Sequence, residues 1–207
     1  MNVDLFEKTA RDYLDRYIVL DNGDFVAGGV FPRIFHGLPV RDIDLYTKDV
    51  QKTIDFYASL GYIYAAGSVQ SNYVSMYLPK EGKGKKLIPH IHLDIIGFHF
   101  DKTPNYINSF DFGICQVAMT TDTFVVRHAS DIESKRLVFN GNYAVPVSYG
   151  HMKNNILTRI NKYTRLGFTI DDANMGAIYK FLLSTNLPPS RGGFRFVSGS
   201  AKPFPLF

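Results

Sequence analysis

The sequence predicts an α/β (α+β) fold, with a mixed sheet flanked by helices and a small helical extension toward the C-terminal end. Three observations lead to this prediction. Short apolar runs typical of strands alternate with amphipathic segments of helical period up to about residue 130. Beyond about residue 131 the recurring pattern is helical. Hydrophobic residues make up 45% of the 207, which is enough to bury a core.

These changes in character also predict where the chain divides. We expect a core over residues 1–130, a helical extension over 131–184 and an irregular tail over 185–207. The tail is rich in proline and glycine, residues that interrupt regular structure.

Composition narrows the classes of protein to which the chain can belong. Cys115 is the single cysteine, so an internal disulfide framework is excluded. No charged-then-apolar leader or 18-residue apolar run is visible, so we expect a cytoplasmic protein with no membrane segment. The net charge of +4 and the isoelectric point near 9.0 are compatible with a phosphate-bearing ligand such as a nucleotide or RNA.

The first 60 residues predict the order helix, strand, short helix, strand, helix. Residues 4–18 place apolar side chains at helical spacing, and so do residues 49–60. Between these helices, "FVAGG" (25–29) and "VRDIDLYT" (40–47) are interpreted as strands.

The rest of the chain predicts a hairpin, two short strands and two helices. "NYVSMYLP" and "KLIPHIHLDIIGF" flank the tip "KEGKGK", whose glycines and lysines suit an exposed turn. Further strands are expected at 110–119 and 123–127, and helices at 152–166 and 172–183.

Two aspartates near the end of a buried strand are the first candidate site. Side chains alternate along a strand, so Asp42 and Asp44 point to one face while Ile43 and Leu45 point into the core. Like charges this close are unfavourable unless they share a cation, and a hard ion such as Mg²⁺ (or Mn²⁺) prefers oxygen ligands. The alternative is a solvated strand end or a pair of turn caps.

A glycine pair gives the aspartates their context. Gly28 and Gly29 directly follow an apolar strand, where glycine permits unusual dihedral angles and exposes backbone N–H groups that can hold phosphate. With the two aspartates on the next strand, the pattern predicts a site that binds nucleotide phosphates and a metal ion.

A third carboxylate would complete the site, and the sequence offers two. On the strand "HIHLDIIGF", Asp94 would share a face with His90 and His92 and could bind metal or accept a proton. Asp111, at the start of the next expected strand, is the competing candidate, and we favour Asp94. The same His-x-His-x-Asp string could instead bind zinc.

The stretch "GGVFPRIFHGLPVRDIDLY" resembles the signature of the DNA polymerase β-like nucleotidyltransferase superfamily, especially the branch of tRNA CCA-adding enzymes and bacterial poly(A) polymerases. The matching features are Gly28 and Gly29, Arg33, the turn at 37–39, and "DID". A second stretch, "ILTRINKYTRLGFTIDDANMGAIYKF", is similar to a helical segment of the same enzymes. The resemblance departs at Ile34, where the family has an acid.

This resemblance implies a nucleotidyltransferase core that transfers a nucleoside monophosphate from an NTP to an acceptor hydroxyl. The acceptor would be an RNA 3′ end, such as that of tRNA, a protein or a small molecule. Asp42, Asp44 and Asp94 would be the catalytic and metal-binding acids, and nucleotide binding would fall to Gly28, Gly29, Arg33, Arg159 and Lys162. Two alternatives stay open: a non-catalytic nucleotide- or RNA-binding relative, and a metal-dependent hydrolase using His90, His92 and Asp94.

Other basic residues could also meet phosphate. Lys83, Lys85 and Lys86 on the hairpin tip could touch an acceptor, although exposed turns carry lysine without any function. Arginines and phenylalanines of the tail could stack on bases, or could simply lie along the core.

Overall fold

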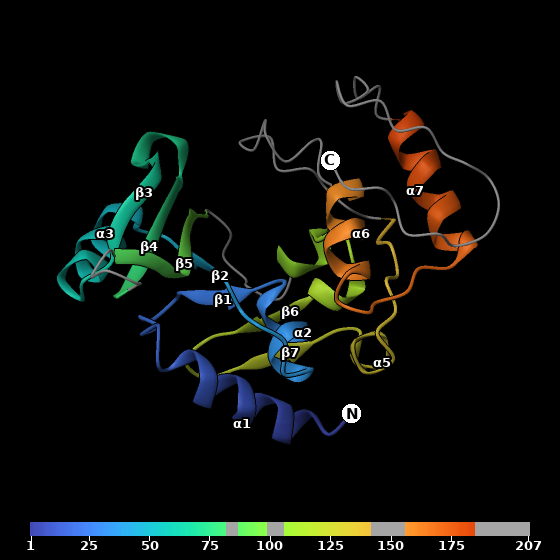
Figure 1. Cartoon of the computed structure of the whole chain (residues 1–207), viewed down its shortest axis with the longest axis horizontal. Helices are drawn as coiled ribbons and strands as arrows, with labels where there is room; N and C mark the ends of the chain where they lie inside the picture. The colour runs from blue at the N-terminus through green and yellow to red at the C-terminus, as the bar shows by residue number, and fades with distance from the viewer. Residues whose placement is uncertain (82–86, 99–105, 142–155, 185–207) are drawn as a thin grey trace.

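The computed structural model describes residues 1–81, 87–98, 106–141 and 156–184. Within these residues, strands form one seven-stranded mixed sheet in the order β3-β4-β5-β2-β1-β6-β7 (Figure 1). The strands are β1 (Phe25–Ala27), β2 (Asp42–Thr47), β3 (Ile63–Ser68), β4 (Tyr73–Glu81), β5 (Leu87–Gly97), β6 (Val117–Met119) and β7 (Phe124–Val126).

The middle of the sheet contains its one parallel pair among the described strands. β2 pairs in parallel with β5, whereas every other neighbouring pair is antiparallel. β2 therefore has a partner on both sides, β5 on one and β1 on the other. Its even-numbered and odd-numbered residues face opposite sides of the sheet, and Ile43 and Leu45 place the main apolar side on the odd-numbered face.

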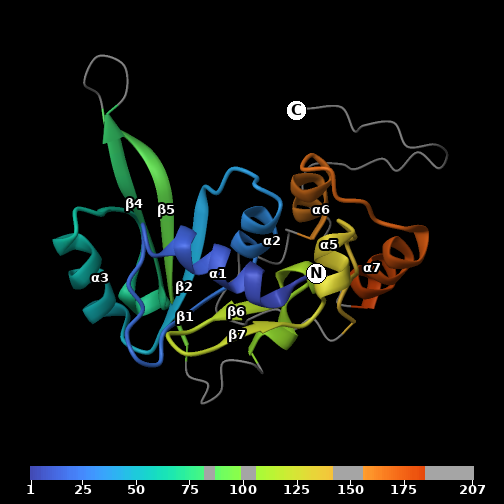
Figure 2. The ribbon, with the colours of Figure 1, turned by 90° about the horizontal axis from the view of Figure 1, so that it is seen from below.

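Three helices cover that apolar side: α1 (Val3–Leu14), α2 (Val30–Phe35) and α3 (Val50–Ser59). Asn2 caps the start of α1, since its side chain accepts a hydrogen bond from the Leu5 N–H. The helix buries Phe6, Ala10 and Leu14. This spacing puts one apolar stripe against the sheet. Figure 2 shows α1 and α2 close together and α3 beside the β3 and β4 end.

The remaining helices lie at the other end of the molecule. They are α5 (Ala129–Glu133), α6 (Ile156–Thr164) and α7 (Asp172–Ser184), with 3₁₀ turns η1 (Val69–Ser71), η3 (Ile107–Ser109) and η4 (Gly113–Cys115) elsewhere. Figure 1 shows α6 and α7 on the opposite side from α3 and β3. Ile156, Ile160, Tyr163 and Ile178 belong to the same buried cluster as the side chains under α1 and α2.

The structure confirms the predicted fold class and the order of the first five elements. Three details differ from the sequence expectations. The opening helix ends at Leu14 rather than at residue 18, because the chain turns there with the Tyr17 N–H donating to the Leu14 carbonyl. β3 was not expected, since its sequence IYAAGS shows no alternation of apolar and polar residues, and five of its six residues are exposed.

The third difference lies in the segment 110–119, which was expected to be one strand. Only Val117–Met119 are strand, because η4 turns the chain just before it, with the Cys115 N–H donating to the Phe112 carbonyl. Asp111 therefore does not begin a strand.

Some expectations concern residues that the structure does not describe. These are the hairpin tip with Lys83, Lys85 and Lys86, the start of the helix expected at 152–166, and the tail 185–207. In the described parts of the chain, no helix is both long enough and apolar enough to cross a bilayer.

Candidate active site

The centre of the candidate site is the face of β2 that α1–α3 leave uncovered. Ile43 and Leu45 are fully buried on the covered side, and Asp42 and Asp44 alternate with them on the other side. The predicted alternation is therefore the observed one. It follows directly from the two-residue period of a strand.

The register of the sheet places Asp94 next to this pair. Asp44 is opposite Asp94 in the parallel pairing of β2 with β5, and Asp42 is opposite His92. Neighbouring strands lie about 4.8 Å apart, so paired side chains on one face are close neighbours. Of the two candidates for a third acid, the structure brings Asp94 beside Asp44.

The next strand, β4, holds the carboxylate of Asp94. Ser75 is opposite Asp94, and Tyr73 is two residues along on the same face. Burial raises the pKa of Asp94, and hydrogen bonds from Ser75 and Tyr73 reduce this rise without cancelling it. Burial and the neighbouring Asp94 raise the pKa of Tyr73 to about 12, so its hydroxyl remains a donor at neutral pH.

The two aspartates of β2 have opposite electrostatic surroundings. Burial, with the charges of Asp94 and Asp42, raises the pKa of Asp44 to about 7. Burial also acts to raise the pKa of Asp42, but the positive charges of Lys162, Arg33 and Arg159 outweigh it and leave this pKa lowered. The site therefore holds one carboxylate that is ionised over a wide pH range and one that is half protonated near neutrality.

Helix α6 brings two cations to the acids. Lys162 Nζ lies 2.9 Å from Asp42 Oδ2 and donates a hydrogen bond to it. One turn earlier, Arg159 Nε lies 2.6 Å from Asp111 Oδ2, and its charge reduces the rise in the pKa of Asp44. α6 is thus the element that balances the negative charge of the β2–β5 face.

The two glycines have different surroundings. Gly28 has a φ of +94°, and a Cβ atom there would lie 3.2 Å from Asp44 Oδ2, so glycine leaves room for the acid. Its N–H donates to the Val117 carbonyl. A Cβ atom on Gly29 would lie 2.6 Å from the hydroxyl oxygen of Tyr163, so this glycine makes room for α6.

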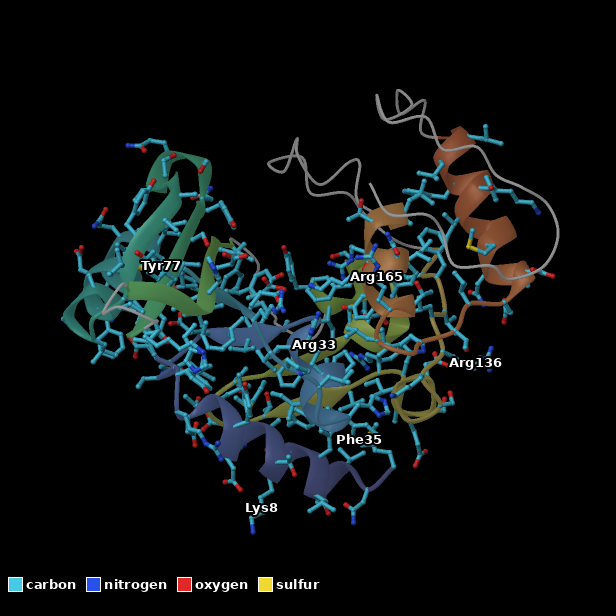
Figure 3. The ribbon with its side chains drawn as sticks, viewed as in Figure 1. Lys8, Arg33, Phe35, Tyr77, Arg136 and Arg165 are labelled. Atoms are coloured by element: carbon cyan, nitrogen blue, oxygen red, sulfur yellow. The ribbon has the colours of Figure 1, made fainter. Side chains whose placement is uncertain are left out.

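Arg33 is a buried cation on α2. Its Nη1 donates to the Pro39 carbonyl at 2.6 Å, while its Nε has no hydrogen-bond partner among the described residues. It is only 8% exposed, and its charge helps to lower the pKa of Asp42. Figure 3 shows it in the middle of the molecule, between the β2 end of the sheet and α6.

The expectation that His90, His92 and Asp94 share one face fails at His90. Leu78 pairs with Ile91 and Pro79 with Pro89, so a bulge leaves His90 without a partner in β4. The centre of its ring lies 6.1 Å from that of Tyr17. The ring of His92 lies 6.1 Å from that of Tyr77 on β4. In the described part of the chain, no three His, Cys, Asp or Glu side chains are grouped as a ready metal site.

Sequence reasoning missed four side chains that surround the predicted ones. Tyr73 and Ser75 were not identified because the register of the hairpin, which places them beside Asp94, could not be predicted. Their alternation with Val74 in "NYVSMYLP" did place them on one face. Cys115 and Tyr163 were hidden because they lie 48 residues apart and meet only when α6 packs on η4, with Sγ 3.1 Å from the tyrosine oxygen.

A mixed sheet with these helices defines the type of fold. The architecture is the nucleotidyltransferase-type fold, and solved structures of this type resemble it. A "tRNA-processing enzyme" in an apo form is 16% identical, with a TM-score of 0.52, and the match covers 78% of this chain and 42% of that one. A CCA-adding enzyme complexed with ATP is 16% identical, with a TM-score of 0.54, covering 88% and 43%.

A third structure, the Thermotoga maritima CCA-adding enzyme complexed with tRNA, is 16% identical, with a TM-score of 0.51 and coverage of 88% and 43%. The chain thus spans less than half the length of these enzymes, and at this identity the likeness is one of fold. The chain itself belongs to the Gabija anti-defense 2 family (Gad2), whose family model matches residues 4–134. A comparison with curated proteins finds no match.

Proposed function

We propose that this protein is a metal-dependent nucleotidyltransferase that moves a nucleoside monophosphate from an NTP to an acceptor hydroxyl. The observation that carries the proposal is the row of carboxylates formed by Asp42, Asp44 and Asp94 on adjacent parallel strands of a nucleotidyltransferase-type fold. A protein without a use for these acids would gain stability by replacing the partly buried Asp44, because desolvation and like charges disfavour its ionised form.

The chemistry of the donor set suits a divalent cation, although no three such side chains are already grouped around one point in the described part of the chain. Asp42 and Asp44 offer hard oxygen ligands from one face of one strand, which is the chemistry that Mg²⁺ or Mn²⁺ prefers, and Asp94 is the third ligand in the proposal. A bound cation would neutralise the triphosphate and relieve the repulsion among the acids.

The protein's own residues would perform the remaining steps. The acceptor oxygen attacks the α-phosphorus, the bond from that phosphorus to the β-phosphate oxygen breaks, and pyrophosphate leaves. Asp94, held by Ser75 and Tyr73, accepts the hydroxyl proton. Arg159 and Lys162 on α6 would bind the negative charge of the leaving pyrophosphate.

The family description names anti-defense against Gabija and no reaction. We propose that the transfer reaction is the means of that anti-defense, so the acceptor is a molecule on which Gabija defence depends. RNA, including tRNA, is the first acceptor class to test, since one solved structure of similar fold is complexed with tRNA.

The test is transfer of label from each of four α-³²P-NTPs, with Mg²⁺ or Mn²⁺, to total RNA and to protein from cells that carry Gabija. We expect labelled product with the wild-type chain and none with Asp44→Asn. NTP binding without transfer would instead indicate a non-catalytic relative, and stoichiometric zinc would support the hydrolase alternative. A second assay asks whether the wild-type chain relieves Gabija defence in cells while Asp44→Asn does not.

A further inference from the structure

Asp111 is a buried acid that the proposed reaction does not use. Its side chain is 5% exposed, and it lies in the segment that precedes η4, under helix α6. Its Oδ1 accepts a hydrogen bond from the Phe112 N–H, and its Oδ2 lies 2.6 Å from Arg159 Nε. This Nε–H is not aligned for a hydrogen bond, so the contact is an ion pair.

Arg159 is held on two further sides. Its Nη2 lies 3.2 Å from Cys115 Sγ, and its guanidinium carbon lies 5.9 Å from the centre of the Tyr163 ring. Asp111 and Cys115 both belong to the short segment around η4, so this segment holds the guanidinium on two sides. About a third of the Arg159 side chain, 32%, remains exposed.

Among the described residues, a guanidinium fixed in this way has donors left for a ligand. Arginine carries five N–H groups in a planar fork, and the contacts with Asp111 and Cys115 use only part of them. Arg159 lies near the acid row, since Lys162 on the same helix contacts Asp42 at 2.9 Å, and its charge reduces the rise in the pKa of Asp44. The donors that Asp111 and Cys115 do not use are suited to an anion that lies beside the carboxylates and their cation.

We propose that Asp111 is a positioning residue that holds the Arg159 guanidinium where it binds the phosphates of an NTP. The inference rests on the proposed function for its ligand, but it concerns binding rather than transfer. It also gives Asp111 a role distinct from that of a third catalytic acid.

A double-mutant cycle on Mg²⁺–ATP binding tests the proposal. Isothermal calorimetry would compare the wild type with Asp111→Asn, Arg159→Gln and the double variant, each checked by thermal unfolding. We expect each single substitution to raise Kd about tenfold, which is the usual size for one charged contact. The double variant should bind within twofold of Arg159→Gln, because Asp111 acts through the arginine.

The matched control is Arg165→Gln, which removes an exposed arginine just beyond the same helix (Figure 3) and should leave Kd unchanged. If Asp111→Asn fails to fold, Arg159→Lys decides the matter. Lysine keeps the charge but lacks the planar fork that contacts both Asp111 and the ligand. The Kd of Arg159→Lys for Mg²⁺–ATP should therefore also rise about tenfold.

The outcomes separate this proposal from the proposed function. Additive losses in the cycle, a normal Kd for Arg159→Lys or no NTP binding by the wild type would each overturn the positioning role. A non-additive cycle without any transfer to RNA or protein would support the positioning role and refute the transferase.

Discussion

Replacing Asp44 with asparagine should stabilise the metal-free protein at alkaline pH. The pKa of this carboxyl is raised from 3.8 to about 7, first by burial and then by Asp94 and Asp42. The native state therefore keeps a proton on Asp44 that the unfolded chain releases. Asparagine has the same shape and cannot ionise, so it removes the cost of charging this position.

The sign and size of the effect follow from linkage. Between about pH 4 and pH 7 the native state binds more protons than the unfolded state, so the free energy of unfolding decreases as pH rises through this window. A shift of about 3 pKa units at about 1.36 kcal/mol each gives about 4 kcal/mol as an upper limit. Because Asp44 keeps some contact with solvent, we expect about 2 kcal/mol at pH 8.

Urea unfolding with EDTA at pH 5 and pH 8 measures this difference for the wild type and Asp44→Asn. The control is Asp42→Asn. The lowered pKa of Asp42 contributes stability that is present above its unfolded pKa and is lost as pH falls, so this variant should be less stable than the wild type at pH 8. An unchanged pH dependence in Asp44→Asn would refute the electrostatic description of the site. Mn²⁺ should raise the melting temperature of the wild type and not that of Asp44→Asn.

Three further substitutions test the surroundings of the acids. Lys162→Gln removes the ion pair with Asp42, and urea unfolding without metal should show a loss of about 0.5–1 kcal/mol that is smaller at acid pH. Gly29→Ala places a methyl group against the Tyr163 hydroxyl, so it should destabilise the fold by about 1–3 kcal/mol, and adding Tyr163→Phe should recover part of this loss. Asp94→Asn should slow transfer at least about 100-fold while NTP affinity changes by less than about threefold.

Each of these three predictions has a result that would contradict it. Equal stability of Lys162→Gln and the wild type at pH 8 would mean that the ion pair contributes nothing. A Gly29→Ala protein that unfolds normally but has lost NTP affinity would return this glycine to a phosphate-binding role. Normal transfer by Asp94→Asn would remove the proton-accepting role from that residue.

Sequence alone was sufficient for features that depend on neighbouring residues. The alternation of Asp42 and Asp44 with Ile43 and Leu45 was predictable because side-chain direction on a strand repeats every two residues. The apolar stripes of α1 and α3 were predictable because apolar side chains that recur with the helical period lie on one face of the helix.

Sequence alone was insufficient wherever a turn or a bulge breaks the local period. Asp111 was expected on a strand, but η4 turns the chain there and directs the residue to Arg159. His90 was expected beside His92, but a bulge removes it from the pairing with β4. Both breaks depend on how the segment packs rather than on its own propensities.

The sequence by itself determined which residues are candidates for the site: a glycine pair, two aspartates on one face, and cations at helical spacing. Only the tertiary structure decided which of them meet. The register that sets Asp94 opposite Asp44 and the packing of α6 that brings Lys162 to Asp42 join segments 50 and 120 residues apart. Such contacts form because burying the whole core lowers the free energy of the folded chain. This total is a property of all the packed segments together, and no local sequence pattern encodes it.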